Sequence, residues 1–159
     1  MIQSTAVYRQ PEIPRELQVP AEAQLILSAR ASGVQIYVCQ QSAEGRMQWT
    51  LKGPEATLYD DQGRAIAEHY AGPTWKHLDG SEVTARAVAR FNVPNGTAIP
   101  WLLLSATGHA GSGLLSRVTT IQRVQTVGGQ PPAEGCNLAA RGTEVRSEYE
   151  AEYYFYAVN

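Results

Sequence analysis

The clearest structural signal in this chain is the segment VQIYVCQQ at residues 34–41. Its β-branched residues recur at every second position, which is the period of a β-strand. A second β-rich run precedes it at residues 24–31, and the two are separated by Ser32-Gly33. A two-residue break containing glycine between two such runs is typical of a tight turn, so the sequence predicts a β-hairpin here.

Further short runs of the same kind follow along the chain, separated by turn residues such as Asp60-Asp61-Gln62-Gly63 and Asp79-Gly80-Ser81. The remaining runs predicted as strands are 47–51, 56–59, 65–70, 74–78, 82–91, 99–107, 114–127 and 144–158. No segment shows a clean helical stripe of apolar residues. About nine to ten short strands at this spacing predict an all-β fold, a single-domain antiparallel sandwich or flattened barrel.

The first 19 residues differ from the rest because they are polar and contain Pro11 and Pro14. Each proline favours extended geometry in its predecessor and cannot donate to a sheet. We therefore expect an extended N-terminal arm at 1–19 and an all-β domain at 20–159. The apolar residues expected to hold this arm against the domain are Val7, Tyr8, Ile13 and Leu17.

Composition excludes several classes of protein. With 159 residues, 43% of them hydrophobic, the chain can form a substantial core as one domain. A formal net charge of −2 argues against a nucleic-acid partner, since basic excess supplies most of that affinity. No apolar run approaches the roughly 20 residues of a membrane-spanning helix. The chain lacks both GxGxxG and GxxxxGK[ST], so we expect no nucleotide cofactor.

The two cysteines, Cys39 and Cys136, lie far apart in the sequence and outside any CxxC motif. They fit one long-range disulfide in an exported protein, and they also fit two buried thiols in a cytosolic one. Residues 1–8 show neither the basic nor the apolar region of a signal peptide, so a cytoplasmic location stays open.

Three histidines are candidates for acid–base chemistry or metal binding, but their spacing is diffuse. His69, His77 and His109 form neither HExxH nor HxH, so we expect no metal site. His69 and His109 remain candidate acids or bases, together with Glu55, which begins a strand rather than a turn. The alternative for each is a structural polar residue. Ser112 beside His109 lies on a glycine-rich turn without the GxSxG pattern of a catalytic serine.

The segment HYAGPTW at residues 69–75 places two aromatic rings beside an imidazole. Aromatic side chains around a polar group are typical of small-molecule or sugar contacts, and also of a tryptophan that plugs a core. Gly72 and Pro73 would allow the strand to twist, so that His69 and Tyr70 converge on one concavity. Trp75 is expected to be mostly buried. The candidate ligand-binding residues are Tyr70, Trp75 and Trp101.

The last predicted strand is strongly aromatic. Alternation places Tyr149, Tyr153 and Phe155 on one face, with Tyr154 and Tyr156 on the other. Aromatic residues on both faces predict a strand that is covered on both sides.

Several blocks of the chain together resemble the domain of unknown function 3455 family of bacteria and fungi. These blocks are 33–39, 54–60, 69–75 with 79–81, 98–104, 121–136 and 153–156. The resemblance covers about residues 11–156. Most members of that family look exported, so the resemblance implies export and favours a Cys39–Cys136 disulfide. It implies no established activity and no catalytic residue.

These observations lead to a functional expectation and one alternative. We expect a secreted or periplasmic β-sandwich module for binding or structure, without a cofactor, whose ligand would be a small molecule or carbohydrate. The alternative is a small cofactor-independent β-barrel enzyme of the isomerase or cyclase type that acts on an apolar small molecule. An enzyme should place a titratable group inside a cavity, whereas a binding module need not.

Overall fold

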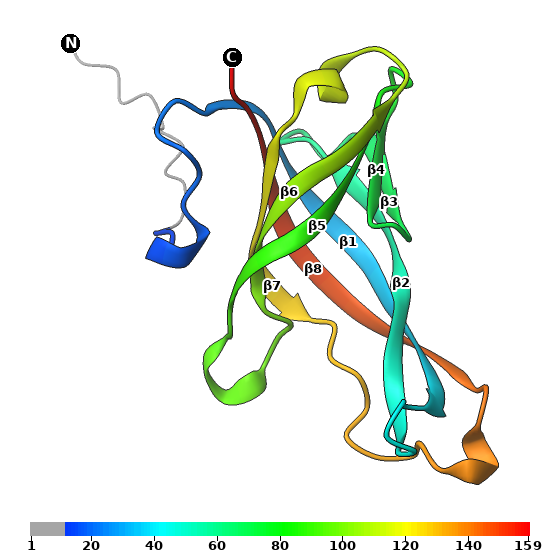
Figure 1. The fold of residues 1–159 in the computed structure, drawn as a ribbon. Helices are drawn as coiled ribbons and strands as arrows, with labels where there is room; N and C mark the ends of the chain where they lie inside the picture. The colour runs from blue at the N-terminus through cyan, green and yellow to red at the C-terminus, as the bar shows by residue number, and fades with distance from the viewer. Residues whose placement is uncertain (1–11) are drawn as a thin grey trace.

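A computed structural model describes residues 12–159, and its strands form one antiparallel barrel (Figure 1). Each strand pairs with its neighbour in the chain, and the last strand returns to pair with the first, which closes the ring. The strands are β1 (Gln24–Gln41), β2 (Met47–Tyr59), β3 (Ala65–Tyr70), β4 (Thr74–His77), β5 (Glu82–Phe91), β6 (Trp101–Ala110), β7 (Thr120–Gly128) and β8 (Glu144–Ala157). The predicted all-β, flattened-barrel class is confirmed.

Helical structure in the described residues is limited to four single 3₁₀ turns, as expected from the absence of helical periodicity. They are η1 (Arg15–Leu17), η2 (Pro94–Gly96), η3 (Leu114–Arg117) and η4 (Leu138–Ala140). None of the helices between residues 12 and 159 has the length and apolar character needed to cross a membrane.

The structure has eight strands where the sequence suggested nine or ten, because β1 and β2 each join two predicted runs. The predicted hairpin at Ser32-Gly33 is wrong: both residues lie inside β1 and pair with β2 and β8. A Cβ on Gly33 would overlap the carbonyl oxygen of Glu55, so the glycine permits close approach of β2 rather than a turn. Pro54 lies within β2 at a point where β2 has a strand on one side only.

The predicted strand 114–127 is also corrected in part, because its first four residues form η3 and β7 begins at Thr120. Leu115 and Val118 are fully buried in the core. The turn η3, drawn in yellow, lies at the upper end of the barrel in Figure 1. A chain that turns to insert these two side chains into the barrel end cannot at the same time continue as a strand.

The core has two parts that lie on opposite faces of β8. Inside the barrel, Tyr149, Tyr153 and Phe155 pack with Trp75 and aliphatic residues of the other strands. Outside, Tyr154 and Tyr156 pack with Val124 in a second, smaller cluster. The predicted division of aromatic residues between the two faces of the last strand is therefore confirmed.

The segment before β1 lies against the outside of the barrel. Leu17 is fully buried, Ile13 packs on the outer cluster, and Gln122 of β7 donates a hydrogen bond to the Leu17 carbonyl at 2.8 Å. Val7 and Tyr8, which were expected to help anchor the arm, lie outside the described residues. The division at residue 19 between arm and domain stays a prediction.

One disulfide joins Cys39 of β1 to Cys136 of the loop between β7 and β8, with Cα atoms 5.3 Å apart. Cys39 lies near the end of β1. In Figure 1, β1, β2 and β8 continue past the rest of the barrel at the lower right. Near the disulfide, Trp49 of β2 donates a hydrogen bond to the Glu134 carbonyl at 3.0 Å. The long loop is thereby fixed to the projecting end of the sheet.

Candidate functional site

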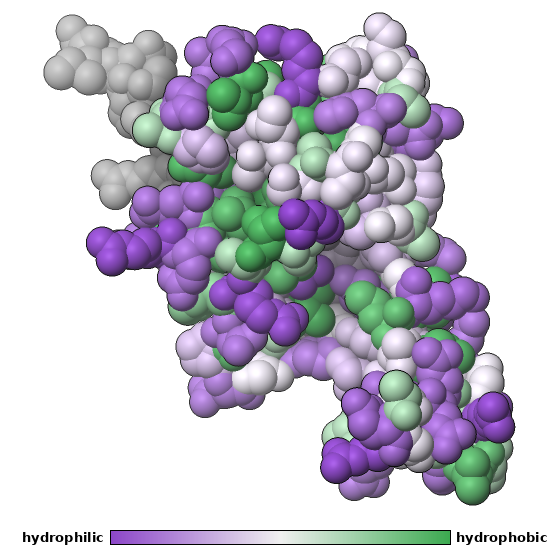
Figure 2. Space-filling view, viewed as in Figure 1, coloured by the Kyte–Doolittle hydropathy of each residue, from purple (hydrophilic) through white to green (hydrophobic). Residues whose placement is uncertain are grey.

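The barrel wall is incomplete between β2 and β5. The β3–β4 hairpin that fills this position is short: β2 pairs with β3 only at residues 56–59, and β5 pairs with β4 only at 82–84. Beyond these residues, the facing edges of β2 and β5 carry no strand among the described residues. Figure 2 shows this face, with apolar side chains gathered at its centre and polar ones around them.

An interior cavity of about 330 Å³ lies behind this gap. Its walls come from all eight strands and the β3–β4 turn, and they are mainly apolar. A second hollow of about 580 Å³ adjoins it toward β5 and β6 and shares several lining residues with it. The residues that border both spaces are Gln35, Leu51, Ala87, Leu102 and Arg123. The volume of the interior cavity, even without the adjoining hollow, falls within the range of small-molecule sites.

His69 and Trp75 line the back of this cavity. They are directly paired across the β3–β4 hairpin, so their side chains lie on the same face of it. Their rings stack with centroids 4.3 Å apart. Trp75 is only 1% exposed, as the sequence led us to expect, and His69 is 3% exposed. The hairpin therefore contributes two buried rings to the interior of the barrel.

The imidazole of His69 is held in one neutral form. Its Nδ1 lies 2.9 Å from the Thr74 carbonyl oxygen, which can only accept, so Nδ1 carries the hydrogen. Its Nε2 then accepts a hydrogen bond from the Tyr153 hydroxyl at 3.3 Å. The Tyr149 hydroxyl lies 3.2 Å from the Tyr153 hydroxyl and extends this hydrogen-bonded network. Burial lowers the pKa of His69 to about 3, and the nearby Arg123 cation adds to that effect.

Arg123 brings a positive charge into the cavity from β7, where it pairs with Tyr153 of β8. Its Nε and Nη2 donate to the Pro100 carbonyl oxygen at 3.1 and 2.7 Å. Burial raises the pKa of the Tyr153 hydroxyl, and the Arg123 charge opposes that rise. Burial likewise raises the pKa of Tyr149, again against Arg123. The tyrosines are therefore neutral donors near a fixed cation.

Two buried polar atoms that line the cavity have no hydrogen-bond partner among residues 12–159. They are the indole Nε1 of Trp75 and the side-chain Oε1 of Gln35, a residue that is 3% exposed. Burying such groups without a partner costs about 1–3 kcal/mol each. A donor and an acceptor thus remain available in a space that is otherwise mainly apolar.

The other candidate residues lie away from this cavity. Tyr70 is 36% exposed on the outer face of β3, and its hydroxyl donates to Glu82 at 2.8 Å. Glu55 is exposed and pairs with Arg146 at 2.7 Å. Both border a shallow outer depression that also reaches His69, but the His69 ring is turned inward. His69 and Tyr70 do not converge, because β3 and β4 keep regular register through Tyr70.

Trp101 and His109, both on β6, also lie outside the cavity lining. Trp101 packs on the outer cluster of Val124, Tyr154 and Tyr156. His109 approaches the Val118 carbonyl oxygen at 2.7 Å through its Nε2. Within the described part of the chain, no group of three His, Cys, Asp or Glu side chains is placed to hold a metal ion.

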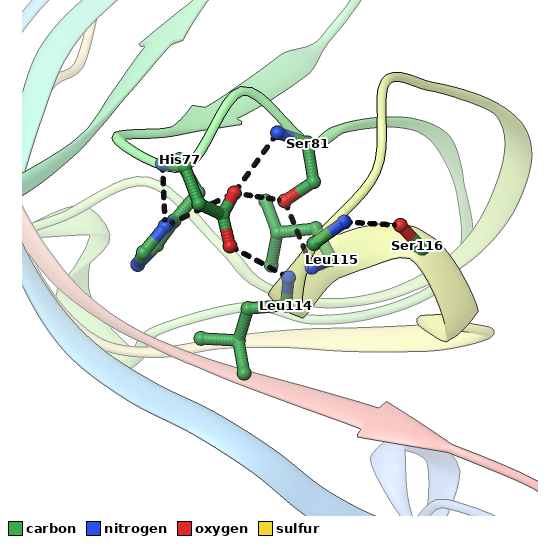
Figure 3. Close-up of polar contacts among 7 residues, drawn as sticks. His77, Ser81, Leu114, Leu115 and Ser116 are labelled. Carbon is green, nitrogen blue, oxygen red and sulfur yellow. Dashed lines mark hydrogen bonds and ion pairs between the residues drawn. The ribbon is translucent and has the colours of Figure 1, made fainter.

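The upper end of the barrel is closed by a network of polar contacts (Figure 3). Asp79 accepts from the backbone and hydroxyl of Ser81 and from the Leu114 backbone, while the Ser81 hydroxyl accepts from the Leu115 backbone at 3.0 Å. These hydrogen bonds lower the pKa of the Asp79 carboxyl, with the Ser81 hydroxyl first among them. The interior is therefore closed at this end of the barrel, whereas the cavity borders the gap between β2 and β5.

Sequence reasoning missed Arg123 and Gln35 as site residues. Arg123 lies two positions after Ile121, within a β-branched run, so it falls on the same inward face. Gln35 similarly shares a face with Tyr37 and Cys39, which are buried. A charged or amide side chain on the apolar face of a strand was the signal that could have indicated both residues.

Fold and cavity together define an antiparallel β-barrel with a partly open wall and a cationic, aromatic interior. The chain belongs to the family described as protein of unknown function (DUF3455), whose model matches residues 20–157. Comparison with curated proteins and with solved structures gave no match.

Proposed function

We propose that this protein is an extracytoplasmic binding module that holds a small, largely apolar molecule inside its barrel. The observation that carries the proposal is the pair of unpartnered buried atoms, Trp75 Nε1 and Gln35 Oε1, in one cavity. A ligand that accepts from the indole and donates to the amide oxygen would satisfy both. Leucine side chains and Pro54 on the walls favour an apolar body over a carbohydrate.

Binding is favoured over turnover by the state of His69. Both of its ring nitrogens are engaged within the protein, and its pKa of about 3 leaves the imidazole a very weak base at neutral pH. The other two candidate acid–base residues, Glu55 and His109, do not line the interior cavity. An isomerase or cyclase reaction would need a titratable group with a pKa nearer the working pH.

An extracytoplasmic location is supported by the Cys39–Cys136 disulfide. Disulfides form and persist in oxidising compartments and are rare where cellular thiols keep cysteines reduced. The resemblance of the chain to a family of mostly exported proteins points the same way.

The proposal is tested by calorimetric titration with the neutral probe 2-naphthamide. We expect saturable binding with one site, which is lost in Ala87→Phe because Ala87 borders both the cavity and the adjoining hollow at the exposed gap. Ala65→Phe is the matched control, since Ala65 is an exposed strand residue of β3. No saturable binding by the wild type, or equal binding by Ala87→Phe, would contradict the proposal.

A further inference from the structure

Arg123 is a partly buried cation with no ion-pair partner in residues 12–159. A buried charge normally requires a counter-charge or several hydrogen bonds, because it loses the solvation of water. The Pro100 carbonyl takes the Nε and Nη2 hydrogens on one edge of the guanidinium. Burial raises the pKa of Tyr153, and a side-chain hydrogen bond between Arg123 and the Tyr153 hydroxyl acts to lower it. A guanidinium has five N–H donors, so donors remain for a further partner after the contacts with Pro100 and Tyr153.

The position of Arg123 matches that of a ligand-binding group. Its side chain borders both the interior cavity and the adjoining hollow, together with Gln35 and Leu102. Trp75, whose N–H lacks a partner, lines the same cavity. The available donors of Arg123 and Trp75 thus face one space.

The charge of the lining also favours an anion. Arg90, Arg123 and Lys52 border the two spaces, and no aspartate or glutamate does. Lys52 is already paired with Glu144 at 2.7 Å, on the exposed side of β2. Arg90 is exposed to solvent, which solvates its charge, whereas Arg123 is partly buried. The charge of Arg123 is therefore the one left to be balanced inside the barrel.

We propose that the molecule held in the barrel carries a single carboxylate, which pairs with the Arg123 guanidinium while its apolar body lies against Trp75 and Leu104. This inference rests on the proposed function and narrows its ligand to an aromatic or aliphatic carboxylic acid. Because a carboxylate only accepts hydrogen bonds, the donor for Gln35 Oε1 would be a separate group on the ligand, such as a hydroxyl. A planar guanidinium edge matches a carboxylate with two parallel N–H···O bonds. One unbalanced cation matches one negative charge.

The experiment compares 2-naphthoate with 2-naphthamide, which have the same ring system and differ in the charge of the polar group. The wild type should bind the carboxylate at least tenfold more tightly than the amide at neutral pH and low salt. The preference should decrease as salt is added, because Arg123 is only partly buried and its charge is therefore screened by ions.

Arg123→Met removes the charge and keeps much of the side-chain length. We expect it to abolish the preference for the carboxylate while 2-naphthamide still binds. Lys76→Met is the matched control, because Lys76 is an exposed lysine of β4 that borders neither space, and the preference should then change less than threefold. Arg123→Lys keeps a positive charge and should retain part of the preference, which provides a second test if Arg123→Met does not fold.

The outcomes separate this inference from the proposed function. If the wild type binds both probes equally, the carboxylate inference is wrong and the binding function stands. Binding of neither probe overturns both. A preference that persists in Arg123→Met, or that disappears equally in Lys76→Met, also overturns the assignment of Arg123.

Discussion

The imidazole of His69 and the indole of Trp75 stack across the β3–β4 hairpin, with an angle of 14° between the planes of the two rings. Tyr153 approaches both rings from β8 with its edge. Three aromatic residues from three strands therefore meet on the inner wall, and each of them carries a polar group. The hairpin that leaves the barrel wall open is also the element that supplies the back of the site.

The stability of the protein should depend on pH through His69. Its pKa is about 3 in the folded state and near 6.5 when unfolded, so the unfolded chain binds the proton first as the pH falls. The contribution of neutral His69 is complete above pH 6.5 and decreases toward pH 3, by about 1.4 kcal/mol per pH unit in the middle of that window. Urea unfolding at several pH values measures it.

His69→Gln is the comparison for this pH dependence, because glutamine does not titrate. The difference in free energy of unfolding between wild type and variant should narrow as the pH falls from 6.5 to 5. A difference that stays constant across that range would show that His69 is not held neutral in the folded protein.

The Cys39–Cys136 disulfide should make a large contribution to stability. It closes a loop across 97 positions of sequence, which the chain-entropy model equates with about 4–5 kcal/mol. Cys39→Ala combined with Cys136→Ala should lower the free energy of unfolding by that order in urea titration. Adding a reductant should lower the midpoint of the wild type and leave the double variant unchanged, and an unchanged wild-type midpoint would refute the prediction.

Gly113 should be among the glycines that tolerate no side chain. Its φ is +153°, and a Cβ there would overlap the Asp79 carboxylate that fixes η3 over the barrel end. Gly113→Ala should therefore lower the free energy of unfolding by at least about 2 kcal/mol more than Gly63→Ala. Gly63 also has a positive φ, of +79°, but open space around it, so equal costs would mean that only backbone strain matters.

Gln122 should hold the segment before β1 on the barrel. It is 2% exposed, donates to the Leu17 carbonyl and accepts from the Tyr156 hydroxyl at 3.1 Å. Gln122→Leu should cost about 1–3 kcal/mol, because it leaves the Leu17 carbonyl without this partner. Trypsin cleavage after the exposed Arg15, followed by mass spectrometry, should become faster. Gln48→Leu, at an exposed position of β2, should leave that rate as in the wild type.

The sequence alone was enough for the strand class, for most strand positions and for the turns at 60–63 and 79–81, because these depend on local period and turn chemistry. It also divided the aromatic residues of β8 correctly between two faces, since alternation is a property of any extended chain. The family resemblance predicted the disulfide, which spacing alone had left open beside free thiols.

Tertiary structure decided which of two locally equivalent outcomes occurred at several residues. Glycine at position 33 suits a turn or a close contact between strands equally well. The structure shows the close contact, because Glu55 and Ala56 of β2 pack against Gly33. We expected Gly72 and Pro73 to override alternation and bring His69 and Tyr70 together, but β3 keeps regular register through Tyr70 and the two lie on opposite faces. Only the closure of the ring determined that His69 faces inward with Arg123 and Gln35. Which face becomes the interior depends on the strands that pair on either side, and that information is distributed over the whole chain.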